Sequence, residues 1–176
     1  QIRYKDYSHL EISLKQLLNK LQEISKNKRE YIVNLKPIIE KQIEILTIFY
    51  YTKALVIKNF SSRILDLKRI GSTMIAVVDK GEPDGIRKGM IFEVYELIKA
   101  KVQPIEKNIG GLIITHPQDK ISQAQPNPRN MFESYAPGPP PNNIVKPFLP
   151  EEYRRRSKNE IEEHIDILKT IRKYYY

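Results

Sequence analysis

The chain has 176 residues, of which 40% are hydrophobic and 29% are charged, and its formal net charge is +9. This length allows one ordinary domain or two small ones, with enough apolar residues for a packed core. The absence of cysteine excludes disulfides, thiolate metal sites and cysteine nucleophiles. No apolar run approaches the ~18 residues that a membrane-spanning helix needs.

The positive charge is concentrated in the first part of the chain. Residues 1–70 carry 14 Lys and Arg against 7 Asp and Glu, whereas residues 71–125 carry 7 of each kind. A basic surface attracts nucleic acid, anionic lipid headgroups and acidic proteins. Nucleic acid is therefore one candidate partner, although the basic residues are spread out rather than clustered.

Residues 8 to about 69 are predicted to be helical, within an N-terminal oligomerisation or docking region over residues 1–70. Apolar residues recur there at alternating spacings of four and three, the repeat of a coiled coil or a long bundle helix. The polar stretch at residues 25–30 leaves open whether this is one helix or a hairpin. The predicted helical seam, assigned to contact with other helices, comprises Leu10, Leu14, Leu17, Leu21, Ile24, Leu35, Ile38, Ile45 and Phe49.

Gly71 is a candidate helix C-cap, after which the pattern changes to that of β-strands. Six of the seven glycines lie between Gly71 and Gly111, where the bends of a small barrel would need them. Residues 71–125 are therefore predicted to form a small SH3-like or OB-like β-barrel. Its expected strands are residues 72–79, 90–97, 110–115 and 120–125.

An acidic loop between the first two expected strands raises the question of a calcium site. Asp79, Glu82 and Asp84 offer oxygen ligands of the right type, but their spacing is not that of an EF-hand loop. Pro83, Asp84 and Gly85 are also the residues that a tight turn requires. The sequence therefore predicts a structural turn and no metal site.

Residues 126–150 contain eight prolines, so we expect an extended arm through which neither helix nor sheet runs. Its large apolar residues are predicted to contact a partner, through Phe132, Tyr135, Ile144 and Phe148.

Residues 151–176 are predicted to form a C-terminal helix. Its apolar stripe consists of Ile161, Ile165, Leu168 and Ile171. A basic patch, Arg154, Arg155 and Arg156, fits a phosphate, an acidic surface or simply a solvated face.

No catalytic constellation is visible. His9, His116 and His164 lie in three different regions, and none has a second histidine three or four residues away. Motifs for a nucleophile elbow, a phosphate-binding loop or a dinucleotide fold are absent from the sequence. We therefore expect no catalytic residue, cofactor or metal, and no enzymatic activity.

Three segments of the predicted barrel carry a resemblance. They are DGIRKGMIFEVY (residues 84–95), IGGLIIT (residues 109–115) and SQA (residues 122–124). Residues of about 73–125 thus resemble the small SH3-like module at the C-terminus of the flagellar assembly protein T family and related modules of bacterial envelope proteins. The resemblance implies a non-catalytic scaffold in a large envelope machine.

The expected fold class is α+β, with N-terminal helices, a small barrel, a Pro-rich arm and a C-terminal helix. The expected function is that of a non-enzymatic structural subunit or assembly factor of a multiprotein complex. The expected partners are protein subunits, including copies of the chain, and no membrane span is predicted. A basic nucleic-acid-binding component of a ribonucleoprotein is the alternative. The resemblance implies the bacterial periplasm or cell envelope, with the cytoplasm as the alternative.

Overall fold

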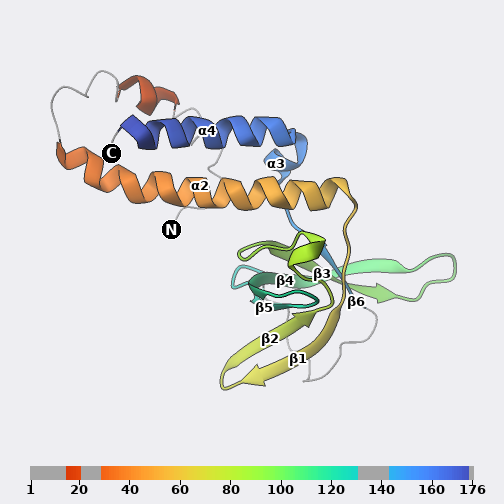
Figure 1. The fold of residues 1–176 in the computed structure, drawn as a ribbon. Helices are drawn as coiled ribbons and strands as arrows, with labels where there is room; N and C mark the ends of the chain where they lie inside the picture. Colours follow the sequence, from red (N-terminus) through yellow and green to blue (C-terminus); the bar gives the residue numbers. More distant parts are fainter. Residues whose placement is uncertain (1–14, 21–28, 131–142, 175–176) are drawn as a thin grey trace. The chain divides into compact units, whose positions relative to one another are not determined.

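A computed structural model describes three ranges of the chain, residues 15–20, 29–130 and 143–174. The chain divides into two compact units, named here unit 1 (residues 1–47 and 150–176) and unit 2 (residues 48–149). Residues 15–20 are helical. The other elements (Figure 1) are helix α2 (Arg29–Ile57), strands β1 (Ile64–Ile70) and β2 (Thr73–Val78), the 3-10 turn η2 (Glu82–Asp84), strands β3 (Ile91–Ile98), β4 (Ile105–Pro117), β5 (Ser122–Pro126) and β6 (Asn143–Pro147), and helices α3 (Glu151–Arg155) and α4 (Lys158–Tyr174).

The expected α+β class is confirmed, with the strands in one antiparallel sheet of order β1-β2-β5-β4-β3-β6. The sheet closes on itself, because Ser62, just before β1, forms a bridge with Val145 of the last strand. Ser62 N donates to the Val145 carbonyl at 3.0 Å, and Val145 N donates to the Ser62 carbonyl at 2.9 Å. The first and last strands of the sheet therefore meet where β1 begins.

Asn143 continues this closure from a buried position. Its Oδ1 accepts a hydrogen bond from Ile64 N at 2.7 Å, and its Nδ2 donates to the Ile64 carbonyl at 3.3 Å. The side chain thereby replaces one backbone pair of a regular ladder.

Asn143→Leu is expected to lower the free energy of unfolding by about 2 kcal/mol, because two buried backbone groups of Ile64 lose their partner. Urea unfolding followed by far-UV circular dichroism measures the change. Asn130→Leu, at an exposed position of the same unit, is the control and should change the stability little. Equal effects of the two substitutions would contradict the role assigned to Asn143.

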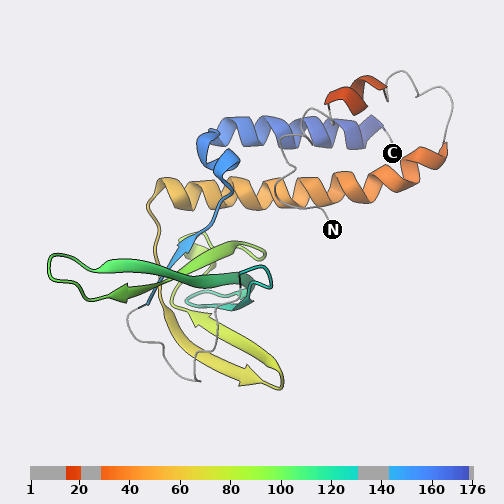
Figure 2. The ribbon, with the colours of Figure 1, turned by 180° about the vertical axis from the view of Figure 1, so that it is seen from behind.

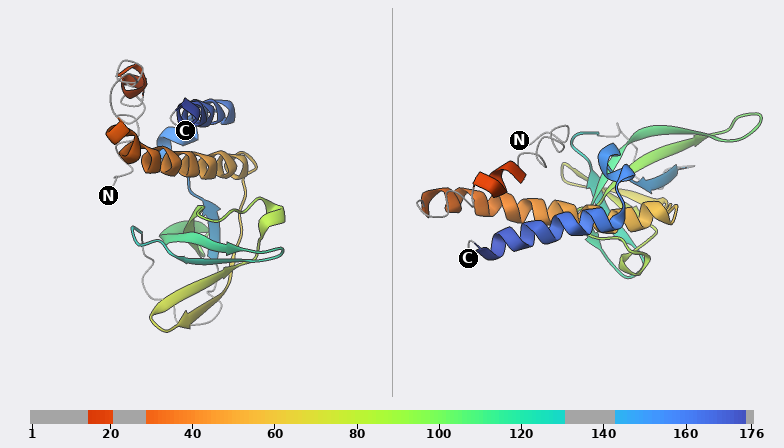
Figure 3. Two further views of the ribbon diagram at one scale, coloured as in Figure 1. Left: turned by 60° about the vertical axis from the view of Figure 1, so that its left-hand side comes forward. Right: turned by 90° about the horizontal axis from the view of Figure 1, so that it is seen from above.

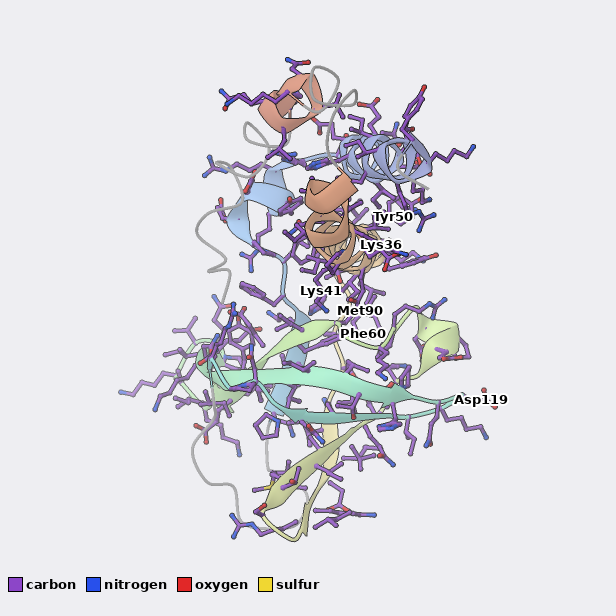
Figure 4. The ribbon with its side chains drawn as sticks, turned by 90° about the vertical axis from the view of Figure 1, so that its left-hand side faces the viewer. Lys36, Lys41, Tyr50, Phe60, Met90 and Asp119 are labelled. Carbon is purple, nitrogen blue, oxygen red and sulfur yellow. The ribbon has the colours of Figure 1, made fainter. Side chains whose placement is uncertain are left out.

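The core of unit 2 lies inside the closed sheet and is filled by apolar side chains from every strand. Phe92 is fully buried, and Phe60 packs against it edge-to-face with ring centroids 6.0 Å apart. Leu55, near the end of α2, covers this core from one end. Figure 4 shows Phe60 and Met90 close together at the core, whereas Asp119 lies out at the β4–β5 turn.

Helix α2 ends at Ile57, so the prediction of helix to about residue 69 was wrong for its last part. Asn59 has φ 51°, Asn59 N donates to the Val56 carbonyl, and Phe60 N donates to the Leu55 carbonyl. These features form a Schellman motif, which stops the helix and brings Phe60 against Leu55.

The following residues form β1 instead of helix. Gly71 has φ 62° and turns the chain from β1 into β2, so its predicted role as a helix C-cap was also wrong. The sheet therefore takes in residues before the predicted barrel of residues 71–125.

The four expected strands are confirmed as β2, β3, the second half of β4, and β5. The prediction that no sheet runs through residues 126–150 was wrong at β6. Pro147 is tolerated there because its missing N–H would face away from β3, whereas the N–H of the next residue, Phe148, continues the pairing by donating to the Ile91 carbonyl. Residues 131–142 lie outside the described residues.

In unit 1, the predicted C-terminal stripe is confirmed as the buried face of α4. The predicted single helix is interrupted, however, because Arg156 is extended (ψ 144°). Ser157 then starts α4 with a capping box: Ser157 Oγ accepts from Glu160 N, and the Glu160 carboxylate accepts from Ser157 N.

Candidate functional site

The acidic loop of unit 2 is a built turn, as predicted. Gly81 precedes the η2 turn, Pro83 lies in its first positions, and Gly85 closes it with φ 99°. The Asp84 carboxylate accepts a hydrogen bond from Gly81 N at 2.9 Å. The Asp79 carboxylate accepts from the Ser62 hydroxyl and from a backbone N–H, which ties the start of β1 to the end of β2.

Two of the three candidate calcium ligands are thus engaged in holding the turn and closing the sheet, and the third, Glu82, is exposed. Within the part of the chain that the structure describes, no group of three or more His, Asp or Glu could hold a metal ion.

Gly85 and Gly89 of the same loop leave room for the last turns of α2 to pack closely against it. A methyl group added at Gly89 would lie 2.7 Å from Ile48 Cδ1, and one at Gly85 would lie 3.0 Å from Leu55 Cδ2. Arg87 lies over the Tyr51 ring, with 5.5 Å between its Cζ and the ring centroid. The loop of residues 81–89 therefore packs against the end of a helix of its own chain.

Four residues of the predicted helical seam lie outside the described residues: Leu10, Leu14, Leu21 and Ile24. Leu17 is half-buried in the helical turn of residues 15–20. Phe49 is buried, 5% exposed, and belongs to unit 2.

The other three seam residues are not the buried side of α2. Leu35 and Ile45 are half-buried, and Ile38 is 44% exposed. The buried positions in this part of the helix are Ile39, Gln42 and Leu46. The predicted seam therefore lies partly beside the buried face of α2 and not on it.

Two of the four predicted arm residues, Phe132 and Tyr135, lie outside the described residues. Ile144 is half-buried in β6, opposite Tyr95 of β3. Phe148 is also half-buried, and its N–H donates to the Ile91 carbonyl at 2.8 Å. Both described residues therefore belong to the sheet or its continuation.

The predicted basic patch lies in and just after α3, where two of its members have acidic neighbours. Arg155 pairs with Glu151 at 3.0 Å, and Arg156 pairs with Glu152 at 2.8 Å. Arg156 also lies over the Tyr153 ring at 5.3 Å. Arg154 is exposed.

Unit 1 also contains a pocket of about 530 Å³ beside α4. Charged groups of both signs and a set of apolar side chains line it. These residues are Lys15, Leu18, Arg156, Glu160, Glu163, His164, Ile167, Leu168 and Ile171. His164 is half-buried in this wall, whereas His116 is exposed on β4.

Sequence reasoning missed an exposed apolar site on the hairpin that joins β3 to β4. Ile98 is 42%, Ile105 57% and Val102 93% exposed. The alternation of the second expected strand continues past residue 97 into this basic stretch, and that was the available signal. These three exposed apolar side chains are not part of the packed interior of the sheet.

Together, these features define a mixed α+β protein with a closed antiparallel sheet. None of the described helices has the length and apolar character needed to cross a membrane. Comparison with protein-family models gives no match for this chain, and a search of curated proteins finds no relative.

Proposed function

We propose that the protein is a non-enzymatic structural subunit or assembly factor that works within a large multiprotein complex. The observation that carries the proposal is the apolar surface left on the helices of unit 1. Ile38 of α2 is 44% exposed and Ile167 of α4 is 45% exposed, although each helix already buries another apolar face. A helix with apolar residues on a second side is suited to contact with a further helix.

The seven-residue repeat supports the same proposal. Leu35, Ile38 and Ile45 follow the coiled-coil spacing, and none of them is fully buried. A second copy of the chain, or a partner helix with the same spacing, would complete their burial.

The two-unit organisation suits a scaffold. Unit 2 holds the end of α2 through its glycine loop, and the remainder of α2 belongs to unit 1. The closed six-stranded antiparallel sheet supports assignment to the SH3-like or OB-like barrels. An envelope or flagellar machine as the setting rests on the resemblance of residues 84–124 alone.

The full chain is expected to self-associate with rising concentration in sedimentation-velocity experiments. Ile38→Ser should weaken the association about tenfold, because one partly exposed apolar side chain no longer becomes buried at the contact. Ile70→Ser is the matched control, since Ile70 is 64% exposed in unit 2. A chain that stays monomeric throughout, or equal weakening by both substitutions, would overturn this role for α2.

The net charge of +9 favours nucleic-acid binding as the second candidate. Lys36 and Lys41 are both exposed on the part of α2 that belongs to unit 1 (Figure 4), where Lys41 pairs with Glu44 at 2.7 Å. This function would show as affinity for nucleic acid that falls steeply between two salt concentrations in a filter-binding assay. Weak binding with little salt dependence would exclude it.

A further inference from the structure

The β3–β4 hairpin projects beyond the sheet that supports it. Strand β6 pairs with β3 only over Phe92–Glu96, and β5 pairs with β4 only from Leu112 onward. Among the described strands, the outer part of the hairpin therefore pairs only with itself. Figures 2 and 3 show this part of unit 2 extending past the other strands.

The tip of this hairpin, defined here as residues 97–105, carries apolar side chains in water. Ile98 and Ile105 are cross-strand partners and so point to the same side of the hairpin. They are 42% and 57% exposed, and Val102 in the connecting loop is 93% exposed. Three large apolar side chains at the end of one projection indicate a contact surface.

The tip is also basic. It contains Lys99 and Lys101, both exposed, and no acidic residue. Within the tip, cationic and apolar side chains therefore occur together without any opposing charge.

The two acidic residues that flank the tip face basic partners. Glu106 forms an ion pair with Lys146 of β6. Glu96 lies opposite Lys107 in the register of the hairpin. The acidic residues at the base of the hairpin therefore do not neutralise Lys99 and Lys101.

We propose that the β3–β4 tip binds the surface of a lipid bilayer that contains anionic phospholipid. Ile98, Val102 and Ile105 would enter the boundary between headgroups and acyl chains. Lys99 and Lys101 would meet the headgroup phosphates, since long basic side chains place their charge in the polar layer while their stems stay apolar. This binding is separate from the proposed helical assembly, so either can fail without the other.

The chemistry of the tip favours a bilayer over the other anionic partners. Nucleic acid or a purely polar acidic protein surface would meet the charge of the lysines but would leave three exposed apolar side chains without a matching environment. A bilayer supplies phosphate at its surface and hydrocarbon immediately below it.

Vesicle flotation of the full chain tests the proposal, with phosphatidylcholine vesicles compared with vesicles that also contain phosphatidylglycerol. The wild-type chain should float with the anionic vesicles and not with the neutral ones. Lys99→Gln with Lys101→Gln should weaken binding about 30-fold, at about 1 kcal/mol for each lysine. Ile98→Ser with Ile105→Ser, and Val102→Ser alone, should also weaken it.

Two substitutions elsewhere in unit 2 serve as matched controls. Ile70→Ser changes an apolar residue that is 64% exposed at the β1–β2 turn. Lys120→Gln changes an exposed lysine at the β4–β5 turn. Neither should alter flotation, and far-UV circular dichroism should show that every variant keeps its fold. No flotation of wild type, or equal losses in controls and tip variants, would overturn the proposal.

The chain has no tryptophan, so a single one reports on the tip alone. The emission of Val102→Trp should shift to shorter wavelength on addition of anionic vesicles, because the ring enters an apolar layer. No shift with vesicles would reject insertion. Strong binding to nucleic acid or to a polyglutamate peptide, lost in the lysine variant while vesicles still fail to bind, would assign the tip to a purely anionic partner.

Discussion

Phe92→Ala is expected to lower the free energy of unfolding by about 4 kcal/mol, the largest effect of any single substitution considered for this protein. Phe92 is fully buried and lies between Leu112 on one neighbouring strand and Pro147 on the other. The Phe60 ring also packs against it. Removing the ring leaves a cavity lined by strands that are hydrogen-bonded on both sides, so they cannot collapse to fill it.

Urea unfolding of the full chain measures this loss, with Val102→Ala as the control. Val102 is 93% exposed in the same unit, so its truncation should change the free energy of unfolding by less than about 0.5 kcal/mol. A Phe92→Ala loss below about 1 kcal/mol would mean that the closed sheet does not have the packed interior described above.

Gly81→Ala is expected to cost about 3 kcal/mol for a different reason, since the added methyl group has no space. It would lie 2.0 Å from the Gln118 carbonyl oxygen and 2.8 Å from that of Asp119. These are backbone atoms of the β4–β5 turn, and the Gln118 oxygen also accepts a hydrogen bond from Glu82 N at 2.8 Å. The substitution therefore separates the acidic turn from the neighbouring hairpin.

Gly71→Ala provides the contrast. Gly81 has an extended backbone that any residue adopts, with φ −130° and ψ −163°, so its cost is steric. Gly71 has φ 62° but no atom within 4 Å of the added methyl group, so its cost is backbone strain of about 1 kcal/mol. If Gly71→Ala proves the more destabilising under denaturant with unchanged m-values, the close approach at Gly81 is refuted.

The part of the fold that could be predicted is the part set by local pattern. Strands β2, β3 and β5 alternate or lie between turn residues, and α4 has a clear apolar stripe. Such periodicities require no knowledge of distant partners.

The elements that were missed depend on partners far away in the chain. Strand β6 forms in a Pro-rich stretch because β3 and Ser62 supply its hydrogen bonds. The end of α2 could in principle have been predicted, since Asn59 followed by Phe60 fits a Schellman motif. The start of α4 could also have been predicted, since Ser157 with Glu160 fits a capping box.

For the candidate sites, sequence spacing explained the acidic turn but not what it contacts. Gly85 and Gly89 allow the close approach of Leu55 and Ile48 of α2, which are some 30 to 40 residues earlier in the chain. The alternation past residue 97 indicated a continuing strand but not the exposure of Ile98 and Val102, because exposure depends on where the neighbouring strands stop pairing. Residue type alone would have placed them in the core.

The hydrogen bonds between Ile64 and Asn143 join residues 79 positions apart. At the usual speeds of translation, the ribosome needs about 4 to 16 seconds to add the intervening chain. During that interval β1 has been made but the strand that seals its open edge has not. Unit 2 therefore completes its fold only after Asn143 has been made, and until Asn143 emerges the nascent chain exposes an unpaired strand edge to chaperones and to other nascent chains.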